Sequence, residues 1–166
     1  LADEPDPSDG VTAMHEAARG GHVGCARALL GARADASALS KRGNSAMCVA
    51  AKHRQWAVLE ALLEGGVSAD GLATLQAARR GAAVPLLRRM RDAGGLRSPV
   101  GRQDVTPLGA AAATDDAGSL ALLIELDAEV DARADANGAR ALHYCADKGS
   151  VRCAQLLLEH GAPLEA

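Results

Sequence analysis

The sequence has almost no aromatic residues. Of its 166 residues only Trp56 and Tyr144 are aromatic, and phenylalanine is absent. A single globular core of this size usually takes much of its buried area from aromatic side chains. Thin layers filled by Ala, Leu and Val do not need them. The composition therefore argues against one conventional core and favours a layered fold.

Long apolar runs and closely paired cysteines are also missing. No run approaches the roughly 20 apolar residues that a membrane-spanning helix needs. The four cysteines form no Cys-x-x-Cys pair, and three of them replace small apolar residues of the repeating pattern described below. We interpret all four as small buried thiols in a reducing compartment, rather than as disulfides or metal ligands. They are Cys25, Cys48, Cys145 and Cys153.

No motif for catalysis or cofactor binding can be recognised. The sequence has no Gly-rich phosphate-binding loop, no Gly-x-Ser-x-Gly and no His/Cys cluster at ligand spacing. His15-Glu16 begins as a zinc-protease motif would, but Arg19 stands where the second His is required. We therefore expect no enzymatic activity, no cofactor and no bound metal.

The chain does contain a helical pattern that recurs. In its first copy Thr12 can cap a helix that starts at Ala13, because its hydroxyl accepts from an unpaired backbone N–H. Gly20-Gly21 ends that helix after about two turns. Apolar residues at helical spacing over 23–30 predict a second helix. Two such short helices cannot bury their apolar faces alone, so they need a neighbouring copy.

Residues 10–35 resemble the ankyrin repeat, whose pattern is Gly-x-Thr-Pro-Leu-His-x-Ala-Ala-x-x-Gly-His, then Leu-Leu and Gly-Ala-Asp. Similar units recur over nearly the whole chain. The resemblance implies an all-α repeat solenoid of stacked helix-turn-helix units with short β-turn fingers, and a function in binding another macromolecule. We divide the chain into a flexible lead-in, 1–7, and an ankyrin-repeat domain, 8–166. The five repeats are placed at about 8–38, 39–69, 70–99, 100–131 and 132–166.

The third repeat departs from the pattern. Ala77-Ala78 follow the matching Ala50-Ala51 by only 27 residues, about six fewer than in the preceding repeat. We expect the finger between repeats two and three to be short or absent, with Asp70-Gly71 making a tight turn there. The resulting notch could admit a bulky partner element such as a helix.

Three features of the other repeats give further expectations. By resemblance, His15 and His143 are structural and hydrogen-bond to the adjacent finger. The only intact Thr-Pro-Leu begins at Thr106 and places Pro at the first helical position. Arg140 replaces the capping Thr of repeat five and should weaken that helix start.

Charge divides the chain into unequal blocks. Residues 70–103 carry 7 arginines and 2 aspartates, net +5, while residues 104–166 carry 4 basic and 11 acidic side chains, net −7. A drift in the composition of solvated faces is one interpretation. By resemblance, however, partners bind at the fingers and the concave face of the first helices. The positions there that could form a basic stripe are Arg19, Lys41, Arg42, Lys52, His53, Arg79, Arg80, Arg102 and Gln103.

The stripe leads us to expect a non-catalytic protein–protein interaction module whose partner offers an acidic segment. An adaptor and a structural subunit of a large assembly are both open. The alternatives are a regulatory or targeting domain of a larger enzyme and, less favoured, a nucleic-acid binder acting through the arginine-rich middle. Trp56 either packs between repeats or anchors a partner. The family resemblance favours a cytoplasmic or nuclear setting. The missing initiator Met suggests a processed piece and leaves an organellar protein open.

Overall fold

The computed structural model describes residues 9–97, 105–133 and 138–164. The expected lead-in at 1–7, and with it Arg102 and Gln103, lies outside these ranges. The chain divides into two compact units, Leu1–Gly95 and Leu96–Ala166. Each unit is described by itself.

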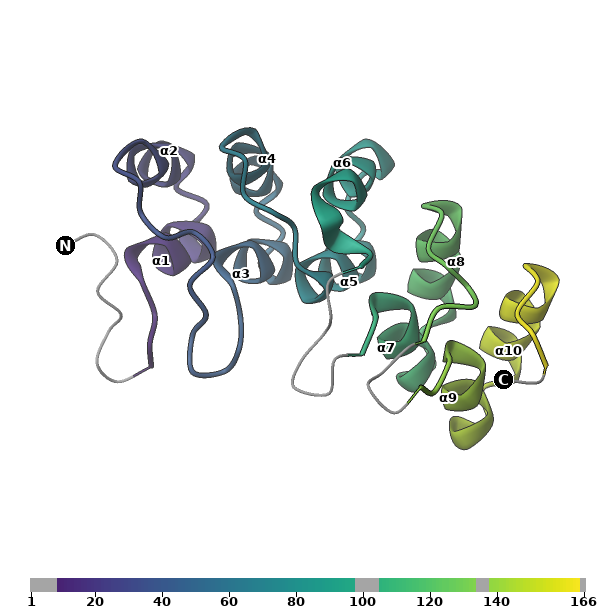
Figure 1. The fold of residues 1–166 in the computed structure, drawn as a ribbon. Helices are drawn as coiled ribbons and strands as arrows, with labels where there is room; N and C mark the ends of the chain where they lie inside the picture. Colours follow the sequence, from purple (N-terminus) through teal and green to yellow (C-terminus); the bar gives the residue numbers. More distant parts are fainter. Residues whose placement is uncertain (1–8, 98–104, 134–137, 165–166) are drawn as a thin grey trace. The chain divides into compact units, whose positions relative to one another are not determined.

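The first unit consists of three helix pairs followed by one π-helical turn. In Figure 1 the first helices of the pairs, α1, α3 and α5, lie in one row, and the second helices, α2, α4 and α6, lie in another. The elements are α1 (Ala13–Gly20), α2 (Val23–Gly31), α3 (Ala46–Lys52), α4 (Trp56–Glu64), α5 (Gly71–Arg79), α6 (Val84–Met90) and η1 (Arg91–Gly95).

Each first helix of this unit begins at a side-chain cap. Thr12 accepts from the backbone N–H of His15, Ser45 from that of Cys48 at 3.0 Å, and Asp70 from that of Ala73 at 2.7 Å. These caps satisfy backbone donors that the first turn of a helix leaves unpaired. Short polar residues therefore fix where each repeat starts.

The helices pack closely because small residues face one another. Ala18 of α1, Ala50 and Ala51 of α3 and Ala77 of α5 are fully buried, and α3 packs against both α1 and α5. Larger apolar side chains of the second helices, such as Leu62 of α4, are fully buried as well. The core therefore consists of thin alanine-rich layers, which agrees with the scarcity of aromatic residues.

The finger between repeats two and three is absent, as the short third repeat predicts. Six residues, Gly65–Asp70, join α4 to α5, whereas fourteen residues, 32–45, join α2 to α3. The expected tight turn at Asp70-Gly71 was wrong, however. Asp70 is the cap of α5 and Gly71 is its first helical residue, because the helix starts earlier than the turn propensity suggested.

The π-helical turn η1 covers the region next to this short connection. The Ala69 N–H donates to the Ala93 carbonyl at 3.0 Å. Gly95 is buried against α5, where a β-carbon would lie 2.1 Å from the Thr74 hydroxyl oxygen. Only glycine fits at this contact, so the end of the third repeat closes onto its own first helix.

The second unit consists of two helix pairs. In this unit α7 packs against α9 and α8 packs against α10. Thr106 caps the first helix by accepting from the Gly109 N–H at 3.2 Å, and Pro107 is its first residue, as the Thr-Pro-Leu motif predicts. The elements are α7 (Pro107–Ala113), α8 (Ala117–Glu125), α9 (Ala141–Lys148) and α10 (Val151–Glu159).

The secondary structure is all-α. Within the described ranges the chain has five helix pairs and no β-strand, apart from one isolated bridge between Arg133 and Arg140. None of the described helices combines the length and apolar character needed to cross a bilayer. The expected all-α repeat class is therefore confirmed.

Candidate functional site

His15 joins the segment before α1 to the finger at 32–45. Its Nδ1 accepts from the Thr12 N–H at 3.1 Å, so the ring proton is on Nε2, which donates to the Asn44 carbonyl at 2.9 Å. His15 is only 2% exposed. The bond across adjacent fingers that the family resemblance implies is therefore present at this histidine.

Asn44 connects the finger at 32–45 to two first helices. Its carbonyl receives the His15 bond from α1, and its side-chain oxygen accepts from the Lys52 ammonium of α3 at 2.6 Å. A backbone bond from the Lys41 N–H to the Asp9 carbonyl, 3.0 Å, adds a further link between the fingers. These contacts hold the finger at a fixed place beside α1 and α3.

A cleft of about 290 Å³ lies between this finger and the helices α1 and α3. Four of the predicted site residues line it, namely Arg19, Arg42, Lys52 and His53. We call this cavity, lined by these four residues, the basic cleft. Two carboxylates, Asp9 and Glu16, line it as well. With three cationic side chains against two carboxylates, the cleft has a small excess of positive charge.

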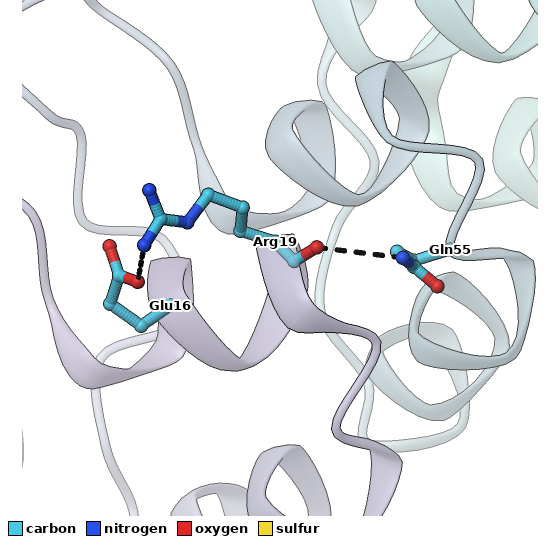
Figure 2. Close-up of polar contacts among 3 residues, drawn as sticks. All are labelled: Glu16, Arg19 and Gln55. Carbon is cyan, nitrogen blue, oxygen red and sulfur yellow. Dashed lines mark hydrogen bonds and ion pairs between the residues drawn. The ribbon is translucent and has the colours of Figure 1, made fainter.

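Arg19 and Glu16 form an ion pair on α1, three residues apart (Figure 2). The two side chains are 62% and 52% exposed. In Figure 2 the guanidinium turns toward Glu16, while the Arg19 backbone carbonyl accepts from Gln55 Nε2 at 3.5 Å. Glu16 therefore offsets part of the charge that Arg19 brings to the basic cleft.

The remaining predicted residues that the structure describes lie elsewhere in the first unit. Lys41 and Arg80 are exposed, and Arg79 is half-buried in the last turn of α5. Trp56 is half-buried as the first residue of α4. Arg102 and Gln103 lie outside the described residues. Lys41, Arg79, Arg80 and Trp56 do not line the basic cleft.

Sequence reasoning missed Asn44, Glu16 and Asp9. The motif Gly-Asn-Ser at 43–45 stands where the repeat has Gly-x-Thr, so the pattern treats Asn44 as variable. Its two roles depend on a histidine and a lysine from different repeats. Glu16 could have been found, since an acidic residue three positions before Arg19 is a common helix-surface pair.

His143, the counterpart of His15 in repeat five, is exposed. Its Nδ1 accepts from the Arg140 N–H at 3.0 Å, the same local bond that His15 makes with Thr12. The Arg140 side chain gives no capping bond to the helix and instead donates to the Asp131 carbonyl at 2.9 Å. The expected loss of the cap at Arg140 is therefore confirmed.

Three of the four cysteines are buried, and the expectation is wrong for Cys25, which is exposed. Cys25 lines an open hollow together with Ala13 and Ala17 of α1 and Leu29 of α2. Burial raises the pKa of the Cys48 thiol to about 12, more than the nearby Lys52 charge lowers it. Burial likewise raises the pKa of Cys153 to about 12. The buried thiols are therefore poor nucleophiles and ligands.

No set of three or more His, Cys, Asp or Glu side chains in the described part of the chain is arranged to hold a metal ion. A hydroxyl–imidazole contact lies at the edge of the basic cleft, with Thr12 Oγ1 2.8 Å from His15 Nδ1, but both side chains are buried at the start of α1. The chemistry of the cleft is that of an ion-pairing and hydrogen-bonding surface.

Comparison with known proteins agrees with this architecture. A family model described as ankyrin repeats in three copies matches residues 1–71 and 74–166. The crystal structure of the human ASB11 ankyrin repeat domain is similar, with a TM-score of 0.66 and 26% identity, covering 100% of this chain and 76% of that one. No curated protein matches the chain.

The ankyrin repeat domain of Bcl-3, described as a unique member of the IkappaB protein family, is also similar in fold. It has a TM-score of 0.71 and 23% identity, and the match covers 92% of this chain and 71% of that one. The chain belongs to the ankyrin-repeat family. Ankyrin repeats are generally protein–protein interaction modules and are typically non-catalytic.

Proposed function

We propose that the chain is a non-catalytic interaction module that binds an acidic protein segment at the basic cleft. The observation that carries this proposal is the convergence of Arg19, Arg42, Lys52 and His53 on one cleft beside a fixed finger. These residues come from two repeats and the finger between them. An adaptor and a subunit of a larger assembly would both use such a surface.

The finger supports rigid recognition. Because Asn44 and His15 hold the finger beside α1 and α3, the cleft exists before a partner arrives. A surface of this kind loses little conformational entropy on binding. Arg42, at the exposed edge of the same finger, can then meet a partner without a large rearrangement.

The electrostatics support a moderate, salt-sensitive affinity. The basic cleft faces two carboxylates, and its arginine and lysine side chains are at least partly exposed. Exposed ion pairs are worth about 0–1 kcal/mol each and are screened by salt. Several such pairs mainly accelerate association and select the partner's sign of charge.

The missing third finger is a second element of the proposal. The connection between α4 and α5, residues 65–70, is too short to form a finger. The finger at 32–45 therefore has no neighbouring finger at repeat three. Arg79 and Arg80 end the first helix of that repeat. We propose that the partner continues from the basic cleft toward these two arginines.

The proposal is tested by affinity capture from native extract with three baits. The first is the wild-type chain, the second carries Arg42→Glu and Arg80→Glu, and the third carries Arg88→Glu and Arg89→Glu. The third is a matched control, because these two exposed arginines lie on α6 and change the charge equally. Circular dichroism verifies that all three baits fold.

The expected result is a protein held by the wild type and the control but lost from the Arg42/Arg80 bait. Equal capture by all three baits would exclude the basic cleft as the site. Binding to RNA or DNA that falls steeply with salt, in place of a protein partner, would support the nucleic-acid alternative.

A further inference from the structure

The first helices of the first unit carry a cation at the same position. Arg19, Lys52 and Arg79 are each in the last turn of α1, α3 and α5. Because α1 packs on α3 and α3 packs on α5, these positions follow one another along the row of helices in Figure 1. We call these three residues the basic row.

The helix dipole contributes to this row but does not fix the repeat position that its cations share. A basic side chain in the last turn is stabilised by the negative end of any helix. The second helices differ among themselves: α2 and α4 have no basic residue in the last turn, whereas α6 has Arg88 and Arg89. In the first helices, by contrast, a cation directly follows the matching Ala-Ala pair in all three repeats, and the cations of α1 and α3 line the basic cleft.

The spacing of the basic row is set by helix packing. Neighbouring packed helices lie about 8–10 Å apart. A ligand that meets all three cations must therefore present an acidic group about every 8–10 Å. Regular ligands of only a few kinds have such a repeat.

A polyproline-type extended chain fits this requirement. It rises about 3.1 Å per residue with three residues per turn, so every third side chain lies on the same face about 9 Å further on. An α-helix needs seven residues, about 10.5 Å, to return to the same face.

We infer that the partner segment is extended and carries Asp or Glu at positions n, n+3 and n+6. Its carboxylates pair with Arg19, Lys52 and Arg79, and Arg42 contacts it from the finger. This inference depends on the proposed function, since it specifies the acidic segment that the basic cleft binds.

Three fluorescent peptides test the spacing. One is a Pro-rich nonapeptide with Glu at positions 1, 4 and 7. The second has the same composition with Glu at positions 1, 2 and 9. The third is a helical peptide with Glu at positions 1, 8 and 15. Affinities are measured by fluorescence anisotropy with the wild type, with Lys52→Gln and with the control Arg88→Gln.

The three-spaced peptide is expected to bind about fivefold to tenfold more tightly than its isomer, since the isomer cannot align all its exposed ion pairs. Lys52→Gln, which removes the middle cation, should abolish most of that preference, and Arg88→Gln should not change it. Equal affinity for the isomers, or tighter binding of the helical peptide, would overturn the inference.

The possible results distinguish the inferred spacing of acidic residues from the proposed acidic-segment function. If the peptides bind equally and Arg42→Glu weakens all of them, the acidic-segment function survives and the spacing fails. If no peptide binds even at millimolar concentration, both proposals fail.

Discussion

The carboxylate of Glu16 is ion-paired with the guanidinium of Arg19 at the edge of the basic cleft (Figure 2). The pair is a local one, three residues apart on α1. It places a negative charge at the surface that we propose to bind a negative partner. Glu16 therefore competes with the partner for Arg19.

Substitution Glu16→Gln should strengthen binding of the acidic partner. The change removes one repelling charge and releases Arg19 from its ion pair, and an exposed pair of this kind is worth up to about 1 kcal/mol, or about fivefold in affinity. Titration of the captured partner or of the three-spaced peptide measures the effect. Glu60→Gln, an exposed glutamate on α4, is the control with the same charge change. Weaker binding by Glu16→Gln would contradict the proposed site.

His15→Ala should destabilise the fold more than His143→Ala. The first substitution removes a buried ring that joins Thr12 to the Asn44 carbonyl, leaving buried polar groups unpaired at a cost of about 1–3 kcal/mol. His143 is exposed and makes its bond at the surface. Urea denaturation of both variants gives their free energies of unfolding. Equal decreases relative to the wild type would show that the His15 bond to the Asn44 carbonyl contributes little to stability.

Arg54→Gly should raise the stability of the chain. Arg54 has φ 57°, in the left-handed region, at the turn between α3 and α4, where the first repeat has Gly21 with φ 74°. A side chain in that region costs about 1 kcal/mol that glycine avoids. The converse change, Gly21→Ala, should destabilise, and its β-carbon would also meet the Gln55 side chain. Thermal unfolding of both variants tests the pair, and a lower melting temperature for Arg54→Gly would contradict it.

The buried Cys48 thiol should make stability depend on alkaline pH. Burial raises the pKa of Cys48 from 9.0 to about 12, so the folded chain holds this proton more tightly than the unfolded chain. The resulting stability is fully present below pH 9 and is lost as pH rises toward about 12. The difference in unfolding free energy between the wild type and Cys48→Ala should therefore shrink between pH 8 and pH 10.5. A constant difference would show that the thiol does not titrate in this way.

The fold was predictable because its determinants are local. Thr12 and the small pairs such as Ala50-Ala51 occur at fixed distances along the chain, and each specifies a cap or a close helix contact. The absence of the finger was predictable from repeat spacing alone, because a repeat that is about six residues shorter must have a shorter connection between helices. Asp70 was misassigned because the same residue favours both a turn and a helix cap.

The site was only partly predictable, since it depends on contacts between repeats. Arg42 and Lys52 were found because their charge and repeat position are visible in the sequence. The role of Asn44 was not, because it depends on partners 29 and 8 residues away. Cys25 matched a small apolar position, but it lines an open hollow beside α1 and is exposed.

The most direct test of the central claim is a map of where an acidic segment binds. Two-dimensional NMR of the isotope-labelled chain, recorded while the three-spaced Glu peptide is added, would report the backbone amides that shift. The account predicts that the largest shifts fall at Arg19, Arg42, Lys52 and His53, and that they disappear in Arg42→Glu/Arg80→Glu. Shifts concentrated on α2, α4 and α6, or unchanged by that double substitution, would contradict it.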